Sequence, residues 1–436
     1  MASAPTVSRA AWLGLALAIG VLALAMAVPW ATEWDVHVRS FPPLHAEWDP
    51  RRGPGTLPAV LLAALGVWQA GRLTATLSWG RLLVVAYAGG LAWMLALAYV
   101  DGQDGVGEVL EHPYEYLRTA RETDDFPATL REYVDRIPFA AGDRRWPPHL
   151  AGHPPGALAV FVVLARVGLG GGWAAGFVVT LLAASAAVAV LVTLRTLGAE
   201  PAARRAAPFL VLGPAAVWQC VSADGMFAAV AAWGMAALAV AAVRRSWLLA
   251  VLAGLLLGYC VMMSYGLALL GLLAVAVLVA ARSWFPLVPA VLAALAVLLA
   301  FAALGFVWWE ALPVVHDRYW DGVQRNRPSS YWWWGNLGAL VASAGPVVGA
   351  GLAAAVARVR EHGERVALLL VGGGAAMVLA ADASRMSQAE VERIWLPFVP
   401  WLLVGTAFLP ERWRRPALAL QVVAALVLQH LLFTGW

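Results

Sequence analysis

Long apolar segments, separated by short arginine-bearing connections, run through almost the whole chain. Of its 436 residues, 62% are hydrophobic and only 13% are charged, and the mean hydropathy is +0.74. Soluble domains average about 45–50% apolar and about 25% charged residues. A chain with so few charges cannot cover itself with solvated groups, which excludes a soluble enzyme, a disordered protein and a fibrous repeat. The pattern predicts an all-α polytopic membrane protein.

The apolar windows indicate how many times the chain crosses the bilayer. Because a spanning helix needs about 20 mostly apolar residues, we expect about 13 transmembrane helices, the shorter ones tilted or extended into their flanks. The windows are 11–31, 57–71, 82–100, 174–194, 206–222, 226–243, 247–263, 264–281, 285–307, 336–357, 366–381, 395–409 and 417–434.

The apolar stretch 154–170 does not fit a simple series of membrane-spanning helices. It follows a long polar segment, and only the turn Gly170–Gly172 separates it from the next window. If both stretches crossed the bilayer, Arg195, Arg204 and Arg205 would lie outside, against the positive-inside rule. We therefore expect 154–170 to be a re-entrant or partly embedded helix, which membranes tolerate where protein buries the backbone.

The arginine-bearing connections predict the orientation. By the positive-inside rule their side is cytoplasmic, as is the N-terminus. They carry Arg72 and Arg81, Arg195 to Arg205, Arg244 and Arg245, Arg282, Arg358 to Arg365, and Arg412 to Arg415. The external side receives the long polar segments 32–56, 101–153, 308–335 and 382–394. Because polar residues are concentrated there, we expect the chemistry of the protein to lie outside.

Charge and composition also indicate which partners and which membrane to expect. The net charge is +4, and all of the positive side chains apart from histidine are arginine, since lysine is absent. Much of this charge lies in short orientation clusters, so we expect no nucleic-acid partner. Abundant Ala, Gly and Arg are typical of a high-GC bacterium and predict a bacterial plasma membrane. Cys220 and Cys260 lie in or beside separate apolar segments and are expected to be buried, inert thiols.

The segment 101–153 carries the first candidate catalytic groups. Asp101 and Asp104 follow directly after an apolar window, and carboxylates at the hydrocarbon boundary are functional candidates. The alternative is that these two acids merely end a helix in water. Downstream, apolar residues recur at helical spacing among charges, which predicts one or two amphipathic helices lying along the membrane surface.

Two histidines and one further acid are the next candidates. His149 and His153 bracket a Pro/Gly-rich turn that would hold them at the interface. A histidine there can donate to a phosphate oxygen or bind a metal, although a capping role is equally compatible with the pattern. Asp224 stands at the outer end of a predicted span, where a carboxylate is costly unless it is used.

Two later external segments combine arginine with aromatic or acidic residues. Arg327 precedes a run containing Tyr331 and Trp333, a combination that suits phosphate pairing and carbohydrate stacking, but also an interfacial aromatic belt. Arg393 stands near the start of a predicted span, with Glu392 placed to orient it. A local ion pair is the alternative for these two residues.

In this order the motifs resemble the C-type glycosyltransferase superfamily, specifically the dolichyl- or polyprenyl-phosphate-sugar mannosyltransferase-like membrane proteins. The segments that carry the resemblance are Asp101 to Asp104, Tyr114 to Arg121, His153-Pro154-Pro155-Gly156, Asp224-Gly-Met-Phe and Glu392-Arg393-Ile-Trp-Leu-Pro-Phe. The resemblance starts at about residue 82, so residues 1–81 would be added spans and 82–436 the catalytic module with its external loop 101–153. Here the acidic motif follows the third predicted span, whereas in relatives it usually follows the first.

The resemblance implies an inverting transfer of sugar from a polyprenyl-phosphate donor to a glycan, lipid or protein acceptor on the outer face. Asp101 or Asp104 would be the base, and the donor phosphate would be held by Arg327, Arg393 and His153. Contacts to sugar or acceptor are assigned to Tyr331, Trp333, His149 and Glu392. Asp224 would be a ligand if a divalent metal, Mg or Mn, takes part.

A transporter or flippase for a lipid-linked substrate is the competing hypothesis. It predicts ionisable residues deep within the spans. Such residues are scarce in windows such as 174–194 and 285–307.

Overall fold

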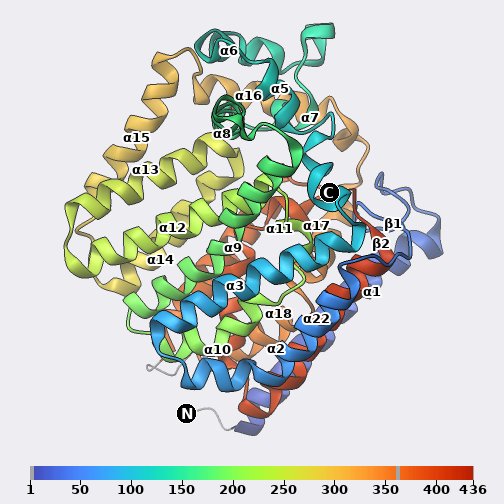
Figure 1. Ribbon diagram of the computed structural model, residues 1–436, viewed down its shortest axis with the longest axis vertical. Coiled ribbons are helices and arrows are strands. Elements are labelled where there is room, and N and C mark those ends of the chain that lie inside the picture. The colour runs from blue at the N-terminus through green and yellow to red at the C-terminus, as the bar shows by residue number, and fades with distance from the viewer. Residues whose placement is uncertain (1–3, 360–363, 436) are drawn as a thin grey trace.

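The computed structural model describes residues 4–359 and 364–435, and nearly all of its regular structure is helical (Figure 1). About 78% of the residues are in helices. Within the described residues, the strands β1 (Glu47–Trp48) and β2 (Leu432–Phe433) form one short antiparallel ladder that pairs Glu47 with Phe433. The predicted fold class, an all-α chain built for a membrane, is confirmed at this level.

Six helices of the described chain are long and apolar enough to cross a membrane. They are α1 (Ala4–Thr32), α2 (Thr56–Thr76), α3 (Trp79–Ala98), α9 (Gly172–Thr196), α12 (Ala223–Arg244) and α19 (Arg365–Ser384). Two bent pairs raise the number to eight if each counts as one span. These pairs are α15 (Leu287–Ala303) with α16 (Trp308–Trp320), and α17 (Ser329–Ala344) with α18 (Val347–Ala357).

The predicted count of about 13 spans is therefore wrong. Several windows fold as shorter helices, among them α13 (Trp247–Met263), α14 (Leu270–Ala281) and α21 (Val399–Leu403). Hydropathy does not register where the backbone breaks. In window 336–357, for example, Gly345 adopts φ +85°, Pro346 follows it, and the axes of α17 and α18 differ by 100°.

The other helices are short, apart from α10 and α22. They are α4 (Asp104–Gly107), α5 (Tyr116–Glu122), α6 (Phe126–Glu132), α7 (Pro148–Gly152), α8 (Gly156–Leu164), α10 (Glu200–Val211), α11 (Ala216–Gln219), α20 (Val391–Ile394) and α22 (Glu411–Leu431).

Small residues let the long helices approach closely. A Cβ atom added to Gly14 of α1 would lie 2.2 Å from the carbonyl oxygen of Gly349 in α18. A Cβ at Gly254 of α13 would lie 2.1 Å from the carbonyl oxygen of Ala290 in α15. In a membrane, where burial of apolar surface adds little between helices, such backbone contact is a main source of association. Glycine is therefore required at both crossings.

The arginine-bearing connections gather at one end of the molecule, which we call the arginine end. The Arg204 guanidinium donates to the carbonyl oxygens of Thr74 and Leu77 at 2.8 and 3.0 Å, joining the start of α10 to the end of α2. Arg205 donates to the carbonyl oxygen of Ala407 at 2.8 Å. The predicted orientation would place this end in the cytoplasm.

The opposite end, which we call the loop end, carries the long connections 33–55, 99–171, 304–328 and 385–398. Its short helices bury apolar side chains such as Tyr116, Leu117 and Leu130. The segment following α8 returns to this end, because Arg166 donates to the carbonyl oxygen of Asp124 at 2.9 Å. With the helical turn Ala165–Leu169 that continues it, α8 extends over Gly156–Leu169 and rises only about 21 Å. It is too short to cross the bilayer.

Candidate functional site

Buried and partly buried ionisable side chains from distant parts of the chain meet at the loop end. We call this group the polar cluster. Its members come from the segment after α1, the helices α5 and α7 with the turn after α7, the start of α12, the connection before α17, and the segment after α19 (Figure 1). They are His45, Glu115, His149, His153, Asp224, Arg327, Glu390, Glu392 and Arg393.

Arg393 is the cation at the centre of the polar cluster. It is only 5% exposed, and its Nη1 donates to Asp224 Oδ2 at 2.9 Å. Its Nη2 lies 3.7 Å from Glu390 Oε2. Burial opposes the charge of the guanidinium, but Asp224, Glu390 and Glu115 together outweigh it and raise the pKa of Arg393. The arginine therefore stays charged inside the protein.

Arg327 is the second buried cation. Its Nε donates to the carbonyl oxygen of His37 at 3.1 Å, and its Nη1 donates to that of Gln388 at 2.6 Å. Its Nη2 donates to Glu390 Oε1 at 3.3 Å. Glu390 thus bridges the two buried arginines, one through each carboxylate oxygen. Burial opposes ionisation of Glu390, but the two arginines lead the charges that outweigh it and lower its pKa.

The segment that holds Glu390 is shaped by an unusual backbone and by Asn336. Ala389 and Glu390 have φ of 71° and 60°, in the left-handed region that side chains other than glycine rarely adopt. Asn336 of α17 stabilises this path, because its Nδ2 donates to the carbonyl oxygen of Ser387 at 2.8 Å and its Oδ1 accepts from the Ala389 N–H at 3.1 Å. The strained turn directs the Glu390 carboxylate towards the arginines.

Glu115 is a buried carboxylate with one oxygen engaged and one available. His149 Nδ1 lies 2.9 Å from Glu115 Oε1, and both side chains are at most 10% exposed. Within the described residues, Glu115 Oε2 has no hydrogen-bond partner. Burial disfavours the charged form, but His149 and the more distant Arg393 outweigh it and lower the pKa of Glu115. The result is an ionised carboxylate with an unused acceptor.

His153 is neutral in the folded protein. Burial lowers its pKa to about 4, even though the Asp224 carboxylate acts in the opposite direction. Its Nδ1 lies 2.9 Å from the carbonyl oxygen of His149. Since a carbonyl oxygen can only accept, Nδ1 carries the proton and Nε2 of the neutral ring is an acceptor. In this state the ring does not suit the predicted role as a donor to phosphate oxygens.

Glu392 contacts the backbone of the segment after α1. Its Oε1 accepts from the backbone N–H of His45 at 3.1 Å, and its Oε2 has no hydrogen-bond partner within the described residues. Burial raises the pKa of Glu392 to about 7. The predicted contact between Glu392 and an acceptor is not tested by this geometry, but its backbone contact ties the segment after α1 into the polar cluster.

The predicted bases belong to a different local network. The Asp101 carboxylate pairs with Arg51 and accepts from Gln429 Nε2 at 2.8 Å. Asp104 begins α4 and is exposed. The recorded partners of Asp101 are thus outside the polar cluster, and its predicted role remains untested.

The predicted sugar-stacking residues differ in their exposure. Tyr331 is fully buried, and its hydroxyl donates to the carbonyl oxygen of Ala25 at 2.7 Å, which fastens α17 to α1. It is unavailable for stacking. Trp333 is 53% exposed and keeps a free aromatic surface.

The predicted metal ligand Asp224 is paired with Arg393 in this structure. In the described part of the chain, no group of three or more His, Cys, Asp or Glu residues is arranged to hold a metal ion. Cys220 and Cys260 are free and buried, as predicted.

Sequence reasoning missed Glu115, Glu390, His45 and Arg51. Glu115 stands within the quoted segment Tyr114 to Arg121, directly beside Tyr116, but tertiary packing buries it and no local pattern signals this. His45 and Arg51 lie before residue 82. The N-terminal region therefore contributes one residue to the polar cluster and one to the network around Asp101.

Comparison with known proteins does not assign the chain to a family. No protein-family model matches the chain, and no curated protein matches it.

Proposed function

We propose that this protein is a membrane glycosyltransferase that moves a sugar from a polyprenyl-phosphate donor to an acceptor hydroxyl of the cell envelope, with inversion. The observation that carries the proposal is the convergence, at the loop end, of two buried arginines with a carboxylate that has an unused oxygen. Four of the five segments that resemble the C-type glycosyltransferases contribute to the polar cluster, and only Asp101 to Asp104 does not.

The two arginines suit a lipid-linked phosphate. Glu390 lies between Arg327 and Arg393 and offers one oxygen to each. A phosphate carries the same kind of charge and more oxygens, so it can take the place of the Glu390 carboxylate between these cations. As the bond between the sugar and the phosphate breaks, negative charge grows on the phosphate oxygen, and both cations stabilise it. Asp224 keeps Arg393 oriented.

We assign the role of general base to Glu115. Its Oε2 accepts the proton of the acceptor hydroxyl while the acceptor oxygen attacks the anomeric carbon of the sugar. The carbon–oxygen bond to phosphate breaks in the same step, and polyprenyl phosphate leaves with the electron pair. His149 holds the other oxygen of Glu115. Because Oε2 is buried, substrate entry has to open the polar cluster, and this is the change that frees the arginines from Glu390.

The distribution of charge favours an enzyme over a transporter. A transporter would carry ionisable residues along a path through its spans. In α12 the ionisable side chains of Asp224 and Arg244 stand at the two ends, and in α19 those of Arg365 and Asp382 are also near the ends. The middle of each helix is apolar or small. The proposal includes the polyprenyl-phosphate donor, the cell-envelope acceptor, and a reaction site at the outer leaflet of a bacterial plasma membrane.

The function is tested by transfer from radiolabelled polyprenyl-phosphate-linked hexoses and pentoses to acceptors extracted from cell envelopes. The protein purified in detergent should consume at least one donor and release polyprenyl phosphate. Arg327→Gln should lower the rate at least about 100-fold, as loss of a preorganised charge contact to a transition state does. Arg325→Gln is the matched control, because Arg325 is exposed two residues away. Failure to consume every donor, or equal rates for the two variants, would refute the proposal.

A further inference from the structure

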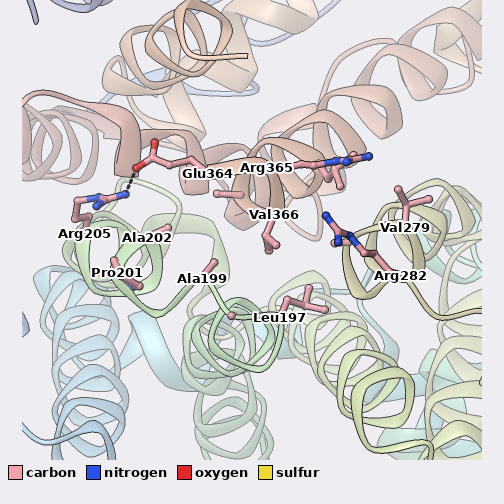
Figure 2. Close-up of a pocket in the computed structure, with 14 residues that line it drawn as sticks. Leu197, Ala199, Pro201, Ala202, Arg205, Val279, Arg282, Glu364, Arg365 and Val366 are labelled. Atoms are coloured by element: carbon pink, nitrogen blue, oxygen red, sulfur yellow. Dashed lines mark hydrogen bonds and ion pairs between the residues drawn. The ribbon is translucent and has the colours of Figure 1, made fainter. Parts of the chain in front are cut away.

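A cavity of about 410 Å³ lies at the arginine end, on the opposite side of the molecule from the polar cluster. It is enclosed by the connection between α9 and α10, the end of α14 and the start of α19 (Figure 2). The 20 residues of α19 run from this cavity to the polar cluster, a distance of about 30 Å along the helix. The cavity is therefore a separate site, and its volume falls within the usual range for small-ligand pockets, about 300–1,000 Å³.

The charged lining of the cavity is strongly positive. Among the described residues that line it are the three arginines Arg205, Arg282 and Arg365 and one acid, Glu364, so their charges sum to +2. Arg205 is neutralised, because its Nη2 lies 2.5 Å from Glu364 Oε1. Figure 2 shows Arg282 and Arg365 together on the other side of the cavity. Within residues 4–359 and 364–435, neither of these two side chains has an ion pair.

The rest of the lining is apolar. Leu197, Val279, Val366 and Leu369 face the cavity beside the arginines. These residues lie near the ends of α9, α14 and α19, and α9 and α19 are long and apolar enough to span a membrane, so the proposed orientation places the cavity at the level of the lipid headgroups. A wall that combines the exposed guanidinium groups of Arg282 and Arg365 with aliphatic side chains matches the junction of a phosphate headgroup with its acyl chains.

We propose that this cavity binds the phosphate of an anionic phospholipid from the leaflet at the arginine end. Arg282 and Arg365 pair with the phosphate oxygens, and the aliphatic wall contacts the glycerol and the first methylenes of the acyl chains. The predicted orientation places this end in the cytoplasmic leaflet, where anionic lipids attract basic residues. This site does not depend on the proposed sugar transfer.

The test measures lipid retention by the purified full-length protein. Protein in detergent is mixed with vesicles of equal parts phosphatidylglycerol and phosphatidylcholine, re-isolated, and its bound lipids are counted by native mass spectrometry. The wild-type protein should retain phosphatidylglycerol in preference to phosphatidylcholine. The double variant Arg282→Gln/Arg365→Gln should bind it about 30-fold more weakly, since each arginine contributes about 1 kcal/mol near a charged membrane surface.

Two controls separate the cavity from general basic charge. Arg244→Gln/Arg245→Gln removes two exposed arginines from the same end of the molecule and should leave retention unchanged. Ala199→Phe narrows the cavity but keeps its arginines, and should also reduce retention. Millimolar inorganic phosphate is added in a parallel sample. Displacement of the lipid by phosphate would overturn the assignment to a phospholipid and give the site to free phosphate, whereas lipid retention in its presence supports the phospholipid.

Equal retention by the wild-type protein and the double variant would overturn the proposal. So would an equal loss in the Arg244→Gln/Arg245→Gln control. The charge-preserving variant Arg282→Lys/Arg365→Lys separates loss of charge from loss of folding and should retain most of the bound lipid. If this variant loses as much lipid as the glutamine variant while melting at the wild-type temperature, the charge argument is refuted.

Discussion

Replacing Glu392 by Gln should remove a pH-dependent loss of stability. Glu392 is 1% exposed, its Oε1 accepts one backbone hydrogen bond, and burial raises its pKa from 4.5 to about 7. Glutamine has the shape of the protonated side chain and can still accept the N–H of His45. The variant therefore mimics the protein with its carboxyl held neutral at every pH.

The size and sign of the effect follow from the two pKa values. Each pKa unit corresponds to about 1.36 kcal/mol, so the interval from 4.5 to about 7 amounts to about 3 kcal/mol. The folded pKa is the higher one, so the favourable contribution is complete below pH 4.5 and is lost as the pH rises to about 7. Relative to wild type, Glu392→Gln should gain about 3 kcal/mol of unfolding free energy across this interval and nothing further above it.

Unfolding in mixed detergent micelles, followed by far-UV circular dichroism at several pH values, measures this difference. His153 titrates in both proteins and so cancels from it. Glu122→Gln is the control, because it makes the same substitution at an exposed carboxylate. A difference between Glu392→Gln and wild type that stays constant between pH 4.5 and 7 would refute the account of Glu392 as a buried carboxyl.

Three further predictions concern other parts of the structure. His153→Gln should reduce the loss of stability on acidification. Burial lowers the pKa of His153 to about 4, so its contribution of up to about 3 kcal/mol to the unfolding free energy is complete above pH 6.5 and is lost as the pH falls towards 4. Acid unfolding curves of the variant and the wild-type protein measure this difference. Glu390→Gln should bind polyprenyl phosphate more tightly in a fluorescence titration, since it no longer competes for the arginines, and unchanged affinity would count against the phosphate site. Gly254→Ala should destabilise the protein by about 1–3 kcal/mol in melting experiments, whereas Gly372→Ala, which meets nothing within 4 Å, should be tolerated.

The helical membrane class could be predicted because it depends on composition and on helix-length apolar runs. The number of spans could not, because hydropathy is blind to backbone breaks such as Gly345-Pro346 and to helices that stop short. The gathering of arginines such as Arg205, Arg282 and Arg365 at one end follows from alternation along the chain. The structure adds the cavity that these three arginines line, which no local pattern contains.

The candidate site could be predicted only in part, and for one physical reason. Asp224, Arg327 and Arg393 stand out because a charge next to an apolar run is costly. Glu115 does not, since an acid in an amphipathic segment is normally solvated and only tertiary packing buries it. Asp101 and Asp104 are both predicted as candidate bases, but the partner of Asp101, Arg51, is 50 residues away in sequence, and motif reasoning does not reveal such a pairing.

The relative importance of the two acidic networks is decided by one comparison of transfer rates. Glu115→Gln, Asp101→Asn and Asp104→Asn are purified in parallel, with Glu108→Gln as an exposed control from the same loop. If the polar cluster is the reaction site, Glu115→Gln should lose at least about 100-fold in rate at unchanged binding of polyprenyl phosphate, as removal of a general base does, while the other three variants stay within a few-fold of wild type. Full activity in Glu115→Gln together with loss in Asp101→Asn or Asp104→Asn would contradict the account and return the base to the Asp101 to Asp104 segment.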